Sequence, residues 1–245
     1  MLPVLYHAHH SRQEEDLSFW SDLASRQGDP ILELGCGTGR ILVPLLKAGN
    51  IIYGLDNDFG MLRFLRGSLP AELKSSVGVY QADMTAFHIK LAFSLIMIPC
   101  NTYSTLTSAA RALVLEGARR HLLPIGIFAV SIPNPLFLRN LPASSETELE
   151  DDFLHPQTGD PVQVSSAWQR TAQQFRLKWY YDLLQPNGQV RRLQVETNHF
   201  LVQVSTYLSE FETAGLSVVD MLGDYDGSAF TEEAPFLILL ARRKN

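Results

Sequence analysis

The sequence has few cysteines and no long apolar run, and each absence excludes a class of protein. Its 245 residues include only Cys36 and Cys100 as cysteines, too few for a disulfide-stapled scaffold, so we expect a reducing compartment. No apolar stretch approaches the roughly 18 to 20 residues that a membrane-spanning helix needs. The first ten residues, MLPVLYHAHH, lack the charged and then apolar layout of a secretion signal. We therefore expect a cytoplasmic protein with no membrane partner.

Basic residues are also fewer than acidic ones. Twenty Lys and Arg residues against 26 Asp and Glu residues leave a net charge of −6. Affinity for nucleic acids depends largely on basic side chains that neutralise phosphates, so this balance argues against a nucleic-acid partner and favours a small-molecule ligand. With 46% hydrophobic and 19% charged residues, the composition is that of an ordinary globular protein. The length predicts one large domain, with or without an insertion, and nothing in the sequence indicates an oligomeric state.

Residues 1–132 alternate short apolar runs with amphipathic stretches. This order is typical of an α/β protein, in which a doubly wound parallel sheet carries helices on both faces. The spacing predicts helices over residues 14–26, 59–66, 108–121 and 206–214, and strands over residues 31–35, 51–55, 77–81, 93–98, 127–132, 216–222 and 236–241.

Residues 133–203 follow a different pattern. The segment 133–160 is rich in proline and acidic residues and is expected to be a solvated loop. Beyond it, apolar and polar residues alternate, and Asn187-Gly188 is a strong signal for a tight hairpin. We predict a small inserted antiparallel sheet with strands over residues 162–170, 175–183 and 189–202. The predicted domains are therefore 1–132 with 204–245, which bind a cofactor, and an insertion at 133–203 that covers the substrate pocket.

The chemistry of the sequence is concentrated after the first two predicted strands. The stretch from Glu33 to Arg40, ELGCGTGR, places a glycine at every second position, so the backbone turns sharply and a ligand is able to press against it. The spacing differs from the Gly-x-Gly-x-x-Gly pattern that cradles a pyrophosphate. Asp56 ends the next strand, about 20 residues further on, where a carboxylate accepts hydrogen bonds from both hydroxyls of a ribose. The pattern indicates a ligand that contains a nucleoside.

These motifs, together with Gln81-Ala82-Asp83-Met84, resemble those of the class I S-adenosylmethionine-dependent methyltransferases, in their small-molecule branch. The resemblance implies a Rossmann-like seven-stranded sheet whose last strand is antiparallel. It also implies S-adenosyl-L-methionine as cofactor and S-adenosyl-L-homocysteine as product. Asn101 is followed by Thr-Tyr rather than by the Pro-Pro-aromatic sequence similar to that of nucleic-acid methylases, which disfavours a DNA or RNA base as acceptor.

The resemblance assigns roles by position. Asp56 is expected to hold the ribose hydroxyls, and Asn101 to lie beside the methionine moiety at the mouth of the substrate pocket. The methionine part is expected to be lined by Gly35, Gly37 and Gly39, with Glu33 nearby and Cys36 filling the same loop.

The adenine end is assigned in the same way. Asn57 and Met61 are expected to flank the ring. Asp83 is expected to hydrogen-bond its exocyclic amine, and the Met84 amide its ring nitrogen.

Methyl transfer requires little acid–base catalysis from the protein. Aligning the acceptor with the S–CH3 bond carries most of the barrier reduction, and a general base is needed only when the acceptor arrives protonated. Tyr103, Tyr225 and His199 are the candidate catalytic residues, in that order.

The sequence also suggests three other interpretations. His7, His9 and His10 suggest a metal, but no further ligand stands at suitable spacing, so we predict no metal site and a terminal segment that closes over the pocket. A nucleotide-dependent oxidoreductase and a non-catalytic adenosyl-ligand-binding protein remain as alternative functions.

Overall fold

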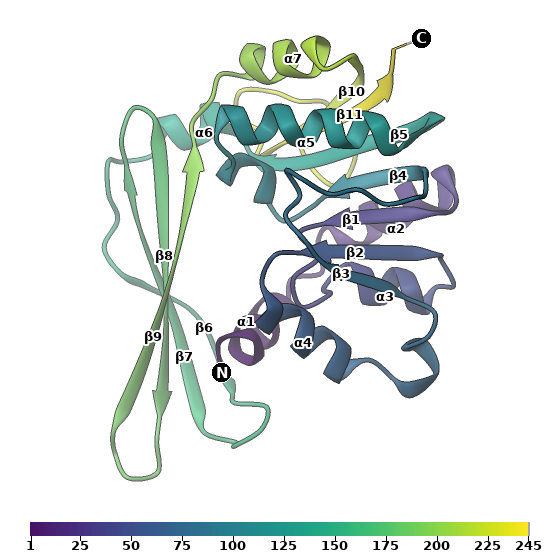
Figure 1. The fold of residues 1–245 in the computed structure, drawn as a ribbon. Coiled ribbons are helices and arrows are strands. Elements are labelled where there is room, and N and C mark those ends of the chain that lie inside the picture. Colours follow the sequence, from purple (N-terminus) through teal and green to yellow (C-terminus); the bar gives the residue numbers. More distant parts are fainter. Residues whose placement is uncertain (245) are drawn as a thin grey trace.

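A computed structural model describes residues 1–244 and contains two separate sheets (Figure 1). The seven-stranded sheet has the order β10-β11-β5-β4-β1-β2-β3. Its pairs β1–β2, β1–β4, β4–β5 and β2–β3 are parallel, whereas β11 runs antiparallel to both β5 and β10. The predicted doubly wound sheet with an antiparallel last strand is therefore confirmed. Its strands are β1 (Ile31–Leu34), β2 (Ile52–Asp56), β3 (Gly78–Gln81), β4 (Phe93–Ile98), β5 (Leu122–Pro133), β10 (Leu216–Leu222) and β11 (Phe236–Arg243).

Helices cover both faces of this sheet because its central strands are apolar on both sides. All six residues of β4 are buried, and they alternate between two cores. Leu95 and Met97 face the core that also contains residues of α2, α3 and α4, whereas Ile96 and Ile98 face the core shared with α5 and α7. The helices are α2 (Leu17–Gln27), α3 (Leu42–Lys47), α4 (Phe59–Ser68), α5 (Ser108–His121) and α7 (Val204–Thr213), with short 3-10 turns η1 (Ala71–Leu73) and η2 (Thr102–Thr105).

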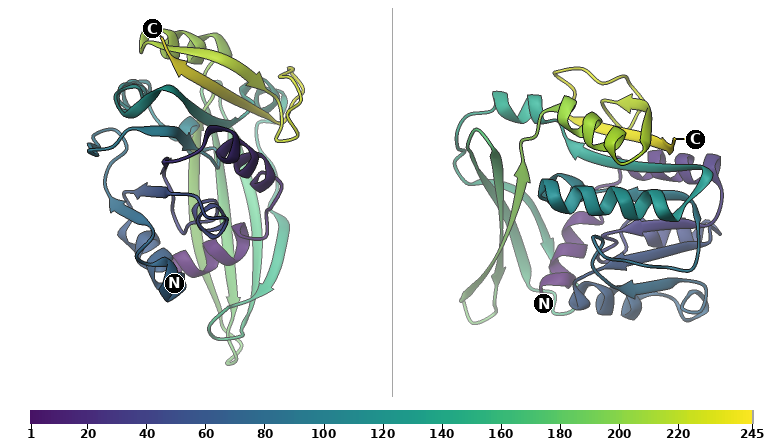
Figure 2. Two further views of the ribbon diagram at one scale, coloured as in Figure 1. Left: turned by 90° about the vertical axis from the view of Figure 1, so that its right-hand side faces the viewer. Right: turned by 45° about the horizontal axis from the view of Figure 1, so that its top comes forward.

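The second sheet is antiparallel, four-stranded and stands beside the ends of the parallel strands (Figure 1). The amino-terminal helix α1 (Leu2–His10) lies across one face of it (Figure 2). Leu5 is fully buried there against Val164 and Tyr181, which fixes the helix to the sheet. The strands are β6 (Glu148–Leu154), β7 (Pro161–Arg170), β8 (Gln174–Leu184) and β9 (Val190–Phe200).

Two sequence-based expectations about the fold are wrong. The segment 133–160 is not a single loop, because it contains α6 (Pro135–Asn140) and the edge strand β6. Acidic side chains are tolerated in β6 because an edge strand leaves many of its residues in solvent. β5 begins at Leu122 rather than at residue 127, and a register shift against β4 accommodates the extra residues.

Candidate active site

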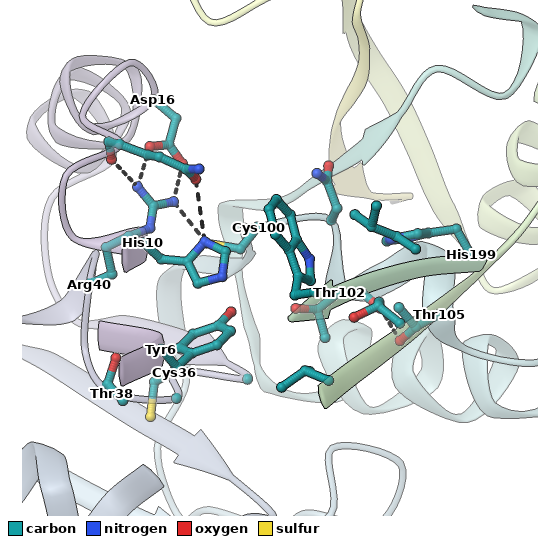
Figure 3. A pocket seen from close by; sticks show the side chains of 18 of the residues that line it. Tyr6, His10, Asp16, Cys36, Thr38, Arg40, Cys100, Thr102, Thr105 and His199 are labelled. Carbon is teal, nitrogen blue, oxygen red and sulfur yellow. Dashed lines mark hydrogen bonds and ion pairs between the residues drawn. The ribbon is translucent and has the colours of Figure 1, made fainter. Parts of the chain in front are cut away.

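A cavity of about 560 Å³ separates the carboxyl ends of the parallel strands from the four-stranded sheet. The loops after β1 and β4 form its floor, β8 and β9 form its roof, and α1 with the segment that follows closes one side (Figure 3). Ligands of open α/β sheets bind at this edge. Of the predicted site residues, the cavity is lined by Glu33, Gly35, Cys36, Gly37, Asn101, His199 and Tyr225. Those that do not line it are Gly39, Asp56, Asn57, Met61, Asp83, Met84 and Tyr103.

Two glycines of the turn after β1 serve different needs. Both Gly37 and Gly39 have positive φ, at 51° and 85°. A Cβ at Gly39 would collide with Leu65 Cδ1 at 2.5 Å, so that glycine permits close packing against α4. A Cβ at Gly37 would meet only Asp56 Oδ2, at 4.0 Å, and would otherwise project into open space. The backbone at Gly37 is thus the part of the turn left bare for a ligand.

Asp56 ends β2 and is tied to the glycine turn. Its Oδ2 accepts a hydrogen bond from the Gly37 amide at 2.8 Å, and its Oδ1 accepts one from the Asp58 amide at 2.8 Å. The carboxylate is half-buried, so its remaining lone pairs are open to solvent. Asp58 caps α4 by accepting hydrogen bonds from the amides of Gly60 and Met61.

The predicted adenine residues lie at the ends of β2 and β3, outside the cavity. Asn57 is exposed, and Asp83 is exposed with its Oδ1 accepting hydrogen bonds from the amide and hydroxyl of Thr85, both at 2.8 Å. These two bonds lower the pKa of Asp83. Met84 lies over the glycine turn, since a Cβ at Gly35 would be 3.3 Å from its Cε. The structure therefore brings Met84 close to the turn and leaves Asn57 and Asp83 on the surface.

Glu33 is buried at the cavity wall, and its Oε2 has no hydrogen-bond partner. Burial raises the pKa of Glu33 well above its ordinary value, although the positive charge of Arg40 opposes the rise. Cys36, in the adjoining turn, fills space against Gly54, where a Cβ would lie 2.7 Å from its Sγ. A buried carboxylate oxygen without a partner indicates a position where a ligand supplies the missing donor.

An ion pair in the cavity was not predicted from the sequence. Arg40 donates hydrogen bonds from both terminal nitrogens to the two oxygens of Asp16, each 2.6 Å long. It also donates to the Gln13 carbonyl at 2.8 Å and to Cys100 Sγ at 2.8 Å (Figure 3). The available signal was the place of Arg40 directly after the glycine turn.

The candidate catalytic residues lie in different environments. The prediction that ranked Tyr103 first is wrong in geometry, because η2 turns its ring into the core, where it is 0% exposed and packs near Tyr207 and Phe128. Tyr225 and His199 do line the cavity. Burial raises the pKa of Tyr225 above its ordinary value, which keeps the phenol protonated. Burial lowers the pKa of His199 to about 4, which keeps the imidazole neutral.

Helix α1 also brings Tyr6 and His10 to the cavity. Its other histidines hold the helix in place, since His7 Nδ1 lies 3.0 Å from Thr38 Oγ1 and His9 Nδ1 lies 3.2 Å from Tyr181 Oη. Over residues 1–244, no three side chains of His, Cys, Asp or Glu are grouped as metal ligands. In the same part of the chain, none of the helices has the length and apolar character that crossing a membrane requires.

Comparison with known proteins gives three kinds of match. Residues 31–126 match the family model described as "Methyltransferase domain". Ribosomal RNA small subunit methyltransferase A of Anaeromyxobacter dehalogenans (strain 2CP-C) is 40% identical over 60 residues, which is 24% of this chain and only about a fifth (20%) of that protein.

Among solved structures, a S-adenosylmethionine-dependent methyltransferase from Clostridium acetobutylicum ATCC 824 superposes with a TM-score of 0.82 at 16% identity, covering 98% of both chains. DesVI of Streptomyces venezuelae gives a TM-score of 0.77 at 21% identity, covering 98% of this chain and 97% of its own. The sugar N-methyltransferase KedS8 from Streptoalloteichus sp ATCC 53650 gives 0.77 at 18% identity, covering 98% and 93%. At these identities the superpositions establish the fold. Residues 31–126 thus match a methyltransferase domain, and the whole chain has the fold of the S-adenosylmethionine-dependent methyltransferase on which it superposes.

Proposed function

We propose that this protein transfers a methyl group from S-adenosylmethionine to a small-molecule acceptor by in-line displacement inside the cavity. The observation that carries the proposal is the continuity of the cavity. It begins at the bare backbone of Gly37 and the unpartnered Glu33, and it ends at the aromatic and apolar roof supplied by β8 and β9. One end suits the cofactor, and the other has room for an acceptor.

The residues present fit the methionine and ribose parts of the cofactor. Glu33 Oε2 needs a hydrogen-bond donor, which the cationic amino group of the methionine moiety provides. Gly37 leaves space for the chain of that moiety, and Asp56 keeps lone pairs free for ribose hydroxyls. The proposed set at the adenine end is Asn57, Met61, Asp83 and Met84.

When bound, the cofactor supplies an electrophilic methyl group on a sulfonium. The work of the chain is then to hold the acceptor in line and to exclude water, and orientation of this kind is worth up to roughly 7 to 11 kcal/mol. The roof residues Leu177, Trp179 and Val195 present apolar surface toward the cavity. His199 and Tyr225 are the polar side chains that we propose contact the acceptor, because both line the cavity and Tyr103 does not.

A small molecule is favoured over a nucleic acid by the shape of the site and by its charge. The cavity is closed on one side by α1 and above by the four-stranded sheet, and its lining carries the acids Glu15 and Asp16 against the single guanidinium of Arg40, which Asp16 neutralises. A phosphate backbone is repelled by such a balance. We propose that residues 133–203 form the part that selects the acceptor. The free thiols of Cys36 and Cys100 agree with the proposed cytoplasmic location.

The proposal is tested by thermal unfolding with S-adenosylhomocysteine and with NAD at equal concentrations. A ligand at about 100 times its dissociation constant adds roughly 2.7 kcal/mol, a shift of roughly 5 to 10 °C for a chain of this size. We expect this shift with S-adenosylhomocysteine alone. A shift with NAD alone would establish the oxidoreductase alternative. Binding of S-adenosylhomocysteine without methyl transfer to any member of a broad acceptor panel would establish a non-catalytic protein.

A further inference from the structure

A hydrogen-bonded chain of three residues connects the floor of the cavity to its roof. Ser104 Oγ donates to the carbonyl oxygen of Asn101 at 2.8 Å and lies 2.8 Å from Nδ1 of His199. Asn101 follows β4 and has φ 62°, a left-handed conformation that aims its carbonyl into this contact. His199 belongs to β9 and lies 95 positions after Ser104 in the sequence.

The hydrogen bonds among Asn101, Ser104 and His199 determine which nitrogen of His199 carries the proton. A hydroxyl has a single hydrogen, and the Ser104 hydrogen is used toward the Asn101 carbonyl. Ser104 Oγ therefore acts as acceptor toward His199, and the imidazole proton lies on Nδ1. Nε2 then carries a free lone pair on a residue that lines the cavity.

The His199 imidazole lies at the acceptor end of the cavity. Ser104 belongs to η2, which begins with Thr102, and a Cβ at Gly35 would touch Thr102 Cγ2 at 3.4 Å. η2 therefore lies between the glycine turn and His199 (Figure 3). The roof around the imidazole contributes Leu177, Val195 and Thr197, none of which is charged.

Resting on the methyl-transfer function proposed above, we infer that the acceptor is a hydroxyl compound and that Nε2 of His199 takes its proton. The O–CH3 bond forms while the S–CH3 bond breaks, and that electron pair stays on sulfur. The hydroxyl proton moves to Nε2, so the products are a methyl ether, S-adenosylhomocysteine and an imidazolium. The imidazolium returns its proton to water after the products leave. Ser104 is a positioning residue that holds the imidazole in the reactive tautomer.

A hydroxyl fits this site better than an amine for two reasons. Amines are mostly cationic near neutral pH, yet the roof residues beside the imidazole, Leu177, Val195 and Thr197, carry no charge that would pair with an ammonium. Second, a base that is protonated only near pH 4 is too weak to hold the proton of an ammonium, but an oxygen that is gaining a methyl group becomes acidic enough to give up its proton to it.

The tautomer is tested first, without any acceptor. Nitrogen-15 NMR of imidazole-labelled protein bound to S-adenosylhomocysteine reports the protonation of each ring nitrogen. We expect His199 to be protonated at Nδ1 and bare at Nε2, and we expect Ser104→Ala to convert it to a mixture of both forms. A proton on Nε2 in the wild-type protein would overturn the inference.

The acceptor class is tested with two libraries, one of alcohols and phenols without amines and one of amines without hydroxyls. Methyl transfer is followed as release of S-adenosylhomocysteine, and products are identified by mass spectrometry. We expect transfer only in the hydroxyl library. His199→Gln should lower kcat roughly 100-fold with KM nearly unchanged, and Ser104→Ala roughly tenfold. The control His88→Gln alters an exposed histidine outside the cavity and should leave both constants unchanged.

The outcomes separate the two proposals. Transfer only to amines would overturn the hydroxyl inference and leave the methyltransferase function intact. Transfer to neither library, with S-adenosylhomocysteine bound, would overturn the proposed function itself. Transfer to hydroxyls with His199→Gln fully active would show that the imidazole takes no proton. Tight S-adenosylhomocysteine binding by both variants, measured by calorimetry, would show that any lost activity does not come from misfolding.

Discussion

Arg40 and Asp16 meet inside the cavity wall through two parallel hydrogen bonds of 2.6 Å each. Only 14% of the Arg40 side chain and 7% of the Asp16 side chain are exposed, so water screens this pair poorly. Trp20 Nε1 donates a further hydrogen bond to Asp16 at 3.2 Å, which ties the pair to α2. The pair therefore joins the glycine turn to the segment that closes the cavity.

Removal of one partner from this pair should be costly. We expect Asp16→Ala to lower the free energy of unfolding by about 3 kcal/mol, because it leaves a buried guanidinium without its counter-charge. Urea denaturation measures the change. The matched control is Glu116→Ala, which breaks an exposed pair with Arg120 and should cost less than about 0.5 kcal/mol. Equal losses in both variants would show that burial does not strengthen the Asp16 pair.

Two glycines with positive φ allow backbone strain to be separated from ligand contact. Gly37 and Gly49 have φ of 51° and 95°, and alanine at either should cost about 1 kcal/mol of stability. Only the Cβ at Gly37 would enter the proposed cofactor position, since Gly49 lies outside the cavity lining. We expect Gly37→Ala to weaken S-adenosylhomocysteine binding at least tenfold in calorimetry, whereas Gly49→Ala leaves it unchanged. Similar affinities in the two variants would place the ligand elsewhere.

Glu33 should make the ligand-free protein sensitive to pH. Its pKa is raised in the folded state by burial, so its contribution to stability is complete below its unfolded pKa near 4.5 and is lost as pH rises through the folded value. Glu33→Gln stays neutral throughout. We expect the stability of wild-type protein relative to Glu33→Gln to fall as pH is raised from about 5 to about 8, as measured by urea midpoints. A constant difference would mean that Glu33 is not protonated in the folded protein.

Binding of the cofactor should lower the pKa of Glu33 if the amino group of the cofactor contacts this side chain. The bound state then favours the Glu33 carboxylate, so binding releases a proton from Glu33. Calorimetry in buffers of different ionisation enthalpy should detect this release with wild-type protein and not with Glu33→Gln.

Asp56 should be needed for binding more than for folding. Asp56→Asn removes the charge that we propose accepts the ribose hydroxyls, and we expect the dissociation constant of S-adenosylhomocysteine to rise more than tenfold. Asp220→Asn changes an exposed carboxylate on β10 and serves as the control. An unchanged dissociation constant in the Asp56 variant would contradict the ribose assignment.

The sequence predicted those parts of the site that depend on local chain geometry. The glycine turn and Asp56 follow neighbouring parallel strands, so strand pairing alone brings them together, and the Gly37 amide indeed bonds Asp56. The fold class was also predictable, because the apolar periodicity of each strand and helix depends on local sequence. β6 was missed because an edge strand does not need an apolar pattern, and its acidic residues resemble those of a loop.

Contacts between distant segments were beyond the sequence. Asp16 and Arg40 lie 24 positions apart, and Ser104 and His199 lie 95 apart, so only the folded structure shows that each pair meets. Tyr103 was a candidate catalytic residue in the sequence analysis, and Ser104 was not. The 3-10 turn η2 places the Tyr103 phenol in the core and the neighbouring Ser104 beside His199. Because η2 is a single short turn, its sequence has no periodic pattern that would predict which side chain faces which way.

Helix α1 contacts both α4 and the four-stranded sheet. The chain passes between the two sheets twice, through α6 and through residues 201–203, and both passages lie on one side of the molecule (Figure 1). On the other side, α1 grips α4 through the rings of His7 and Phe64 and grips β8 through His9 and Tyr181. Helix α1 therefore ties the four-stranded sheet to α4 on the side opposite the two chain connections.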